Sequence, residues 1–219
     1  MLPRAMGGTR AGGDHGRCVK EARLVLFMRE EVRARWRRRA ASAGEFRRQQ
    51  HAPPDPPPSD MIQIFVAGDA DTRKKDEPPP PAGYGAIAVE GGDEIFTLGG
   101  MITAGRTPNV KTTTGNLADL VAFTRALQWA DQHSRAQRRA ICIRYNSEYA
   151  ARISTGAWRA KKHKAMAEEA RRAWAQLKSR RGGRVWMRHV PRSDLLYMRA
   201  GGLAQAGKNG TRTYAETVS

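Results

Sequence analysis

The sequence predicts an α/β domain whose elements follow the order βββαβααβα. Two segments carry this prediction. Residues 61–67 (MIQIFVA) are rich in β-branched and aromatic side chains and lie between a proline-rich stretch and Gly68, which is typical of a buried strand. Residues 116–134 repeat apolar side chains at helical spacing and predict a long helix with a wide apolar face. A folded domain should therefore begin near residue 61.

Two more strands are expected directly after the first. Residues 83–90 and 94–98 are strand-like runs separated by the pair Gly91-Gly92, which can turn the chain. The first three strands should therefore form an antiparallel meander. The loop at 99–113 leads into a cluster of threonines that can cap the helix at 116–134.

The second half of the domain alternates strands and helices. Residues 139–145 are almost entirely apolar in their middle, which predicts a strand covered on both faces. A short helix should start near Ser147, and a longer helix with a basic outer face should span 160–180. A fifth strand is expected at 184–189, and a last helix, weakened by two glycines, at 194–206.

The N-terminal part differs in composition from this domain. Residues 1–50 form an extension with twelve arginines, in which a basic helix is expected from about Cys18. This helix fits an RNA-binding arm, an organelle-targeting presequence or a solvated basic face, and the sequence leaves all three open. Residues 51–60 form a semi-rigid proline-rich linker. The folded domain then covers 61–208, and 209–219 form a C-terminal tail.

The charge of the chain predicts a polyanionic partner. The sequence has 39 Lys and Arg against 21 Asp and Glu, a formal net charge of +18. Residues 156–199 concentrate this excess, with thirteen basic and three acidic side chains, which favours phosphate binding over a merely solvated face. No apolar run approaches the roughly 18–20 residues of a membrane-spanning helix. Nucleic acid is therefore the expected partner, and no membrane is expected.

The cysteines and histidines argue against two classes of site. Two cysteines, Cys18 and Cys142, cannot build a disulfide framework, so a reducing intracellular compartment is expected. The five histidines show no spacing with cysteines or carboxylates that would hold zinc. No transition-metal site is predicted.

Four short segments, taken in this order, resemble ribonuclease H of the type that cuts the RNA of RNA–DNA hybrids. They are GYGAI at 83–87, ADLVAFTRAL at 118–127, YNSEYAA at 145–151 and VWMR at 185–188. The resemblance covers about 61–208. It implies a ribonuclease H-like fold, with a five-stranded mixed sheet flanked by helices.

The chemistry of that family needs about four carboxylates, which hold two Mg²⁺ ions. One ion activates water and the other stabilises the leaving oxygen. The family positions correspond here to Ala67, Asp119, Asn146 and Gly201, of which one is acidic. The resemblance therefore implies a catalytically inactive member with no catalytic residues and no cofactor.

Two other functions remain open on the sequence. Asp69, Asp119 and Asp194 could rebuild a metal site if they converged, and the chain would then be an active Mg²⁺-dependent endoribonuclease of RNA–DNA hybrids. Such a site would be displaced by roughly 6–7 Å along the first strand. His189 is not assigned the role of the family's proton-shuttling histidine, because the loop around it is altered. The second alternative hypothesis is that the chain is a basic protein-interaction module.

The expected ligand is RNA or an RNA-containing duplex. The chain would bind it inside a ribonucleoprotein with other proteins, such as a ribosome, with the mitochondrion as one candidate compartment. Asn116 matches an asparagine at the family's hybrid-contacting helix start, but could simply cap that helix. Trp158 could stack on a base or pin a helix, whereas Trp129, Trp174 and Trp186 fit core positions. The predicted nucleic-acid-binding residues are Asn116, Trp158, Arg159, Lys161, Lys162, Lys164, Arg171, Arg172 and Arg188.

Overall fold

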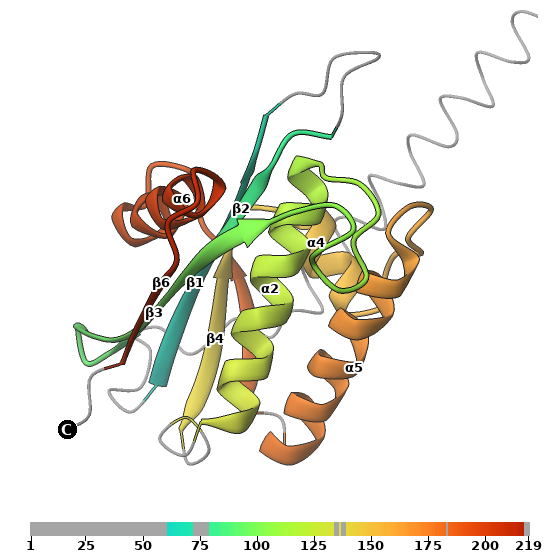
Figure 1. The fold of residues 1–219 in the computed structure, drawn as a ribbon. Helices are drawn as coiled ribbons and strands as arrows, with labels where there is room; N and C mark the ends of the chain where they lie inside the picture. Colours follow the sequence, from blue (N-terminus) through green and yellow to red (C-terminus); the bar gives the residue numbers. More distant parts are fainter. Residues whose placement is uncertain (1–60, 72–78, 134–135, 137–138, 183, 217–219) are drawn as a thin grey trace, which may run out of the picture. The chain divides into compact units, whose positions relative to one another are not determined.

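The computed structural model describes residues 61–71, 79–133, 136, 139–182 and 184–216. Within these residues the chain forms a six-stranded mixed sheet with helices on both faces (Figure 1). The strands are β1 (Met61–Ala70), β2 (Ala82–Glu90), β3 (Asp93–Ile102), β4 (Ala140–Tyr145), β5 (Val185–His189) and β6 (Thr213–Glu216). The helices are α2 (Gly115–Gln132), α4 (Glu148–Ser154), α5 (Lys164–Arg181) and α6 (Leu195–Lys208).

The order of strands in the sheet is β5-β4-β1-β2-β3-β6. β1, β2 and β3 pair antiparallel, which confirms the predicted meander. β1 and β4 pair parallel, as do β4 and β5. The carboxyl ends of β1, β4 and β5 therefore meet at one edge of the sheet, which is where open α/β sheets commonly bind ligands.

Alternate residues of β1 face the two sides of the sheet, because side chains alternate along a strand. Ile62 and Ile64 belong to the main core with Phe123 of α2, and α4 and α5 complete that layer. Phe65 packs on the opposite face in a smaller cluster with Ala200 of α6. Figure 1 shows α6 on one side of the sheet, and α2 with α5 on the other. Both faces of β1 are thus covered, as its apolar run predicts.

Helix α6 approaches the strands so closely that glycine is required at the contact. A Cβ atom on Gly83 would meet the carbonyl oxygen of Ala204, and one on Gly85 would meet that of Ala200, well inside van der Waals contact. A Cβ atom on Gly207 would lie 2.5 Å from the carbonyl oxygen of Gly100. The helix backbone therefore lies directly against the strand backbones.

The sequence prediction of five strands was wrong by one. Part of the predicted C-terminal tail, 213–216, forms β6 and pairs antiparallel with β3. Tyr214 also packs edge-on against the ring of Phe96, with 5.7 Å between ring centroids. This four-residue segment is a strand because of its pairing with a distant strand, which its own sequence does not reveal.

Two element boundaries differ from the predicted ones by about four residues. β3 continues to Ile102, four residues beyond the prediction, because Gly99 and Gly100 belong to the strand and lie against α6. The long basic helix begins at Lys164 rather than at about 160. The predicted basic helix and proline-rich linker of 1–60 lie outside the described residues. None of the helices in the described part is both long and apolar enough to cross a membrane.

Candidate nucleic-acid interface

Asp119, the one acidic residue at the four family positions, is fixed between α2 and β1. Its Oδ1 atom accepts a hydrogen bond of 2.9 Å from the backbone N–H of Gly68. A Cβ atom on Gly68 would collide with the backbone of Ala118 and Asp119, so the strand and the helix touch here. Burial raises the pKa of Asp119, while hydrogen bonds from Ser147 and Gly68 and the positive charge of Arg192 act in the opposite direction. The carboxyl group is a half-buried acceptor of local hydrogen bonds.

The other three family positions offer little to a cation. Ala67 is buried in the core, and Gly201 on α6 has no side chain. The Asn146 amide is already engaged, because its Nδ2 donates to the carbonyl of Val190 at 2.9 Å and its Oδ1 accepts from Arg192 Nε at 3.3 Å. Mg²⁺ takes close to six oxygen ligands in octahedral geometry. One half-buried carboxylate and one occupied amide beside an arginine do not fit a pair of such ions.

The three aspartates of the alternative metal site have separate partners. Asp69 forms an ion pair of 2.8 Å with Lys208 Nζ. Asp194 caps α6, since its Oδ1 accepts hydrogen bonds of 3.0 Å from the backbone N–H groups of Leu196 and Tyr197. Across the described ranges, no group of three or more His, Cys, Asp or Glu side chains is arranged to hold a metal ion. The structure does not bring Asp69, Asp119 and Asp194 together.

A cavity of about 590 Å³ lies where the loop before α2 meets the start of α5. Three lysines and three threonines contribute to its wall, and no carboxylate does. The lining residues, which we call the lysine pocket, are Asn109, Lys111, Thr112, Thr113, Thr114, Lys162, His163, Lys164 and Ala165.

Hydrogen bonds fix the two walls of the lysine pocket. Thr114 caps α2 by accepting a bond of 3.2 Å from the backbone N–H of Leu117, and its Oγ1 lies 3.4 Å from Nε2 of His163. Thr113 donates to the carbonyl of Pro80. Asn109 donates to Glu169 of α5 at 2.9 Å, which ties the loop to that helix. The loop before α2 and the start of α5 are thus held together by side-chain hydrogen bonds.

Two helices begin at this pocket. α2 starts directly after Thr114, and α5 starts directly after His163, which has a positive φ of 56° and makes no side-chain cap. Helix N-termini carry partial positive charge and free N–H groups, so both add to the attraction for an anion. Burial and the neighbouring Lys162 lower the pKa of His163. The composition and geometry of the pocket suit an anion with several negative charges.

The predicted nucleic-acid-binding residues separate into two groups. Exposed side chains that remain available at the surface belong to Asn116, Arg159, Lys161, Lys162, Lys164 and Arg172. Because Thr114 is the cap of α2, the capping alternative for Asn116 is wrong. Arg188 is half-buried on β5, opposite Arg144 of β4.

The side chains of Arg171 and Trp158 also make contacts within the protein. The Arg171 guanidinium donates to the carbonyls of Ile153 at 3.2 Å and Trp158 at 2.7 Å, which anchors the segment between α4 and α5. The Trp158 ring covers the guanidinium of buried Arg152, 4.6 Å from the ring centroid. The Trp158 side chain keeps 36% of its surface exposed, so one part of the ring still faces solvent.

Sequence reasoning missed Lys111, the three threonines and His163 as site residues. Lys111 lies about fifty residues from Lys162 along the chain, and only the packing of α2 on α5 brings them together. The available signal was local: a lysine followed by three hydroxyl residues at a helix start is a composition that suits phosphate.

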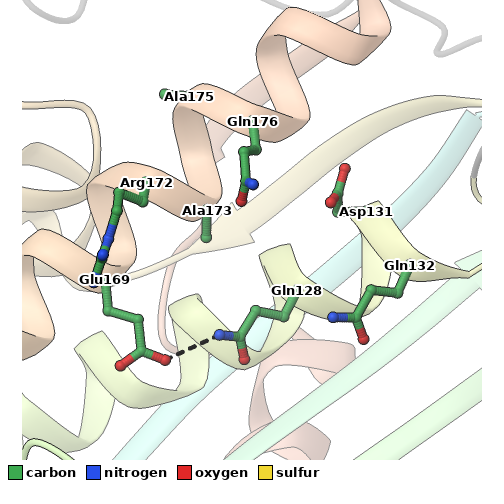
Figure 2. A pocket seen from close by; sticks show the side chains of 8 residues that line it. All are labelled: Gln128, Asp131, Gln132, Glu169, Arg172, Ala173, Ala175 and Gln176. Atoms are coloured by element: carbon green, nitrogen blue, oxygen red, sulfur yellow. Dashed lines mark hydrogen bonds between the residues drawn. The ribbon is translucent and has the colours of Figure 1, made fainter.

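A second groove, of about 490 Å³, runs between α2 and α5 (Figure 2). Its lining combines amides with charges of both signs. Gln128 donates to Glu169 at 3.0 Å, and Asp131 pairs with Arg180 at 2.9 Å. Figure 2 shows the Gln128–Glu169 bond crossing the groove. The two carboxylates make this groove a poorer anion site than the lysine pocket.

Comparisons with known proteins are informative at the level of structure. No protein-family model matches the sequence, and no curated protein matches it. The fold is similar to that of LC11-RNase H1, isolated from compost by a metagenomic approach, with a TM-score of 0.53 and 24% identity over 68% of this chain and 96% of that one. RNase H1 from the halophilic archaeon Halobacterium salinarum is 24% identical over 68% of this chain and 98% of its own, with a TM-score of 0.47.

The protease-reverse transcriptase of prototype foamy virus matches with a TM-score of 0.50 and 14% identity, over 68% of this chain and 21% of that longer one. The likeness to the compost enzyme, with a TM-score above 0.5 over 96% of that protein, is a likeness of fold. The chain therefore has a ribonuclease H-like fold.

Proposed function

We propose that this chain binds nucleic acid through the lysine pocket and the basic surface beside it. The observation that carries the proposal is the pocket itself, where Lys111, Lys162 and Lys164 surround hydroxyl groups at the start of two helices. Ammonium groups, hydroxyls and helix N-termini are the groups that proteins use to hold phosphates.

A polymer suits this surface better than a single small anion does. Exposed Arg159, Lys161 and Arg172 extend the positive charge beyond the pocket. The chain as a whole carries +18. Each phosphate that a basic side chain neutralises releases counterions, so a surface with several such contacts gains affinity for a polyanion. The likeness in fold to a protein named RNase H1 supports the same class of ligand.

The proposal includes binding without cleavage. Ala67, Asn146 and Gly201 stand where the family pattern has carboxylates, and Asp119 is half-buried and hydrogen-bonded to Gly68. We infer that the chain acts as a metal-independent structural component of a ribonucleoprotein, such as a ribosome, the mitochondrial ribosome included, with RNA or an RNA-containing duplex as ligand. Sedimentation of the protein with RNA-containing particles, lost after ribonuclease treatment, would support this assembly, whereas sedimentation that survives treatment would favour a protein partner.

The binding proposal is tested with the full chain and fluorescein-labelled RNA–DNA hybrid or duplex RNA. Fluorescence anisotropy across a salt series gives Kd and its salt dependence. Replacing Lys162 by Gln should weaken binding and lower the slope of log K against log salt by about 0.9 for a lost duplex phosphate contact. Lys178→Gln is the matched control, because Lys178 lies about 21 Å along α5 from the pocket at 1.5 Å per residue.

Equal affinity of Lys162→Gln, Lys111→Gln and the wild type would overturn the role of the pocket. Cleavage is assayed on the same hybrid with Mg²⁺ or Mn²⁺, and no product is expected. Cleavage that disappears in Asp119→Asn would show that the chain is an active hybrid endoribonuclease.

A further inference from the structure

We propose that Arg192 forms a second phosphate-binding subsite, at the carboxyl ends of β4 and β5, in which a guanidinium group contacts a phosphodiester directly. This inference rests on the proposed binding of nucleic acid and adds where a second phosphate is held. It also assigns an arginine to the place where the resemblance would put metal ions.

A chain of hydrogen bonds fixes the position of the subsite. The backbone N–H of Val190 donates to the carbonyl of Tyr145 at 2.8 Å, which continues the β4–β5 pairing. The Asn146 side chain then bridges the two strand ends, because its Nδ2 donates to the Val190 carbonyl at 2.9 Å and its Oδ1 accepts from Arg192 Nε at 3.3 Å. The asparagine therefore orients the arginine.

The loop that carries Arg192 is held at both ends. Pro191 restricts its own φ, and the backbone N–H of Asp194 donates to the Pro191 carbonyl at 3.1 Å to close a turn around Arg192. Asp194 also caps α6, which fixes the exit of the loop. A side chain on such a frame loses less conformational freedom when it binds.

The terminal nitrogens of Arg192 remain available to a ligand. The bond to Asn146 uses Nε alone, and the side chain is exposed. No ion pair joins Arg192 to a carboxylate anywhere in the described part of the chain. The exposed ring of His189 lies beside the same amide, with Nε2 3.5 Å from Asn146 Nδ2. Guanidinium groups bind phosphates with two parallel N–H bonds, which an ammonium group cannot do.

The subsite and the lysine pocket lie at the same end of α2. The pocket adjoins Gly115, the first residue of α2, and Asp119 lies about 6 Å further along the helix axis at 1.5 Å per residue. Asp119 accepts a hydrogen bond from Ser147, which follows Asn146 in the chain, so the subsite also lies beside α2. Both proposed anion sites therefore lie near the start of α2.

The test compares the full-length wild type with Arg192→Gln, Arg192→Lys and Arg212→Gln. Arg212 is an exposed arginine between α6 and β6, so its replacement removes the same charge away from the subsite. The probe is the fluorescein-labelled RNA–DNA hybrid, measured with EDTA present and in a salt series. Thermal unfolding of each variant is measured in parallel.

We expect wild-type binding to be unaffected by EDTA. Arg192→Gln should weaken it about tenfold and lower the salt slope by about 0.9, as for one lost phosphate contact. Arg192→Lys should retain the slope but only part of the affinity, and Arg212→Gln should bind like the wild type.

Wild-type affinity in Arg192→Gln, combined with weakened binding in Lys162→Gln, would overturn the Arg192 subsite and leave the proposed function intact. A lower melting temperature of Arg192→Gln with unchanged affinity would assign Arg192 a purely structural role and also overturn the subsite. Loss of wild-type binding in EDTA would show that a metal ion holds the phosphate instead. If the wild type binds neither hybrid nor duplex RNA, the proposed function fails, and this inference fails with it.

Discussion

Three glycines of α6 offer a matched test of the packing of this helix on the sheet. Gly201, Gly202 and Gly207 lie in the same helix, but their surroundings differ. A Cβ atom on Gly201 or Gly202 would meet no atom within 4 Å, whereas one on Gly207 would lie 2.5–2.8 Å from three backbone atoms of Gly100. Alanine should therefore have opposite effects at the two kinds of position.

The magnitudes follow from two opposing contributions. Alanine in place of glycine in a helix interior stabilises by about 0.8–1.0 kcal/mol, and this is the expected gain at Gly201 and at Gly202. At Gly207 the same gain is offset by overpacking of about 1–3 kcal/mol against a strand backbone that cannot rotate away. We expect a net loss of up to about 2 kcal/mol there. For a chain of this size, 1 kcal/mol corresponds to about 2–4 °C in Tm.

Urea unfolding followed by circular dichroism measures these differences as shifts in the transition midpoint at constant m. Gly202→Ala serves as the control for Gly207→Ala, because both change one glycine of one helix. A stable Gly207→Ala variant would mean that α6 does not lie against β3 as described. A destabilised Gly201→Ala variant would mean that the side of α6 at Gly201 is covered.

Three further substitutions test single side chains. Burial raises the pKa of Asp119, so the protonated form is favoured in the fold and its stabilisation is lost as pH rises from the ordinary value of 3.8 through the raised one. The Asp119→Asn variant should therefore unfold at a higher urea concentration than the wild type at pH 7, and at the same concentration below pH 3.8. A variant less stable than the wild type at pH 7 would contradict this reasoning. Burial also raises the pKa of the Cys142 thiol to about 11. In a Cys18→Ser variant, a thiol reagent at pH 8 should therefore label Cys142 only after unfolding. Rapid labelling of the folded protein would refute the burial of Cys142. Arg181→Met should lower the free energy of unfolding by about 2–3 kcal/mol, because the buried guanidinium donates to two backbone carbonyls; a loss below about 1 kcal/mol would show that these bonds are replaced by water.

Local patterns in the sequence predicted the elements whose apolar side chains face a core. The run at 61–67 and the helical spacing of 116–134 identified β1 and α2 within a few residues, because burial dictates both patterns. The order of elements then led to the fold. β6 escaped prediction since four residues with two exposed side chains carry no such pattern.

The candidate site was harder to predict because it depends on residues that are distant in sequence. Lys162 and Lys164 were identified from charge, but their neighbour Lys111 could be placed only after α2 and α5 had been packed. The charge pattern also selected Arg171, whose guanidinium donates hydrogen bonds to backbone carbonyls. Composition therefore finds a basic region, whereas hydrogen bonding decides which of its members face a ligand.

The pairing of β6 with β3 has a consequence for folding. Gly99 pairs with Thr213, so more than a hundred residues must be synthesised before this ladder can close, and such high contact order slows folding. Until then β3, which carries Phe96 and Leu98, has an open edge that other chains could join. β6 thus covers the edge of β3. Truncation before Thr213 should increase the aggregation of nascent or refolding chains more than it lowers the stability of the folded protein.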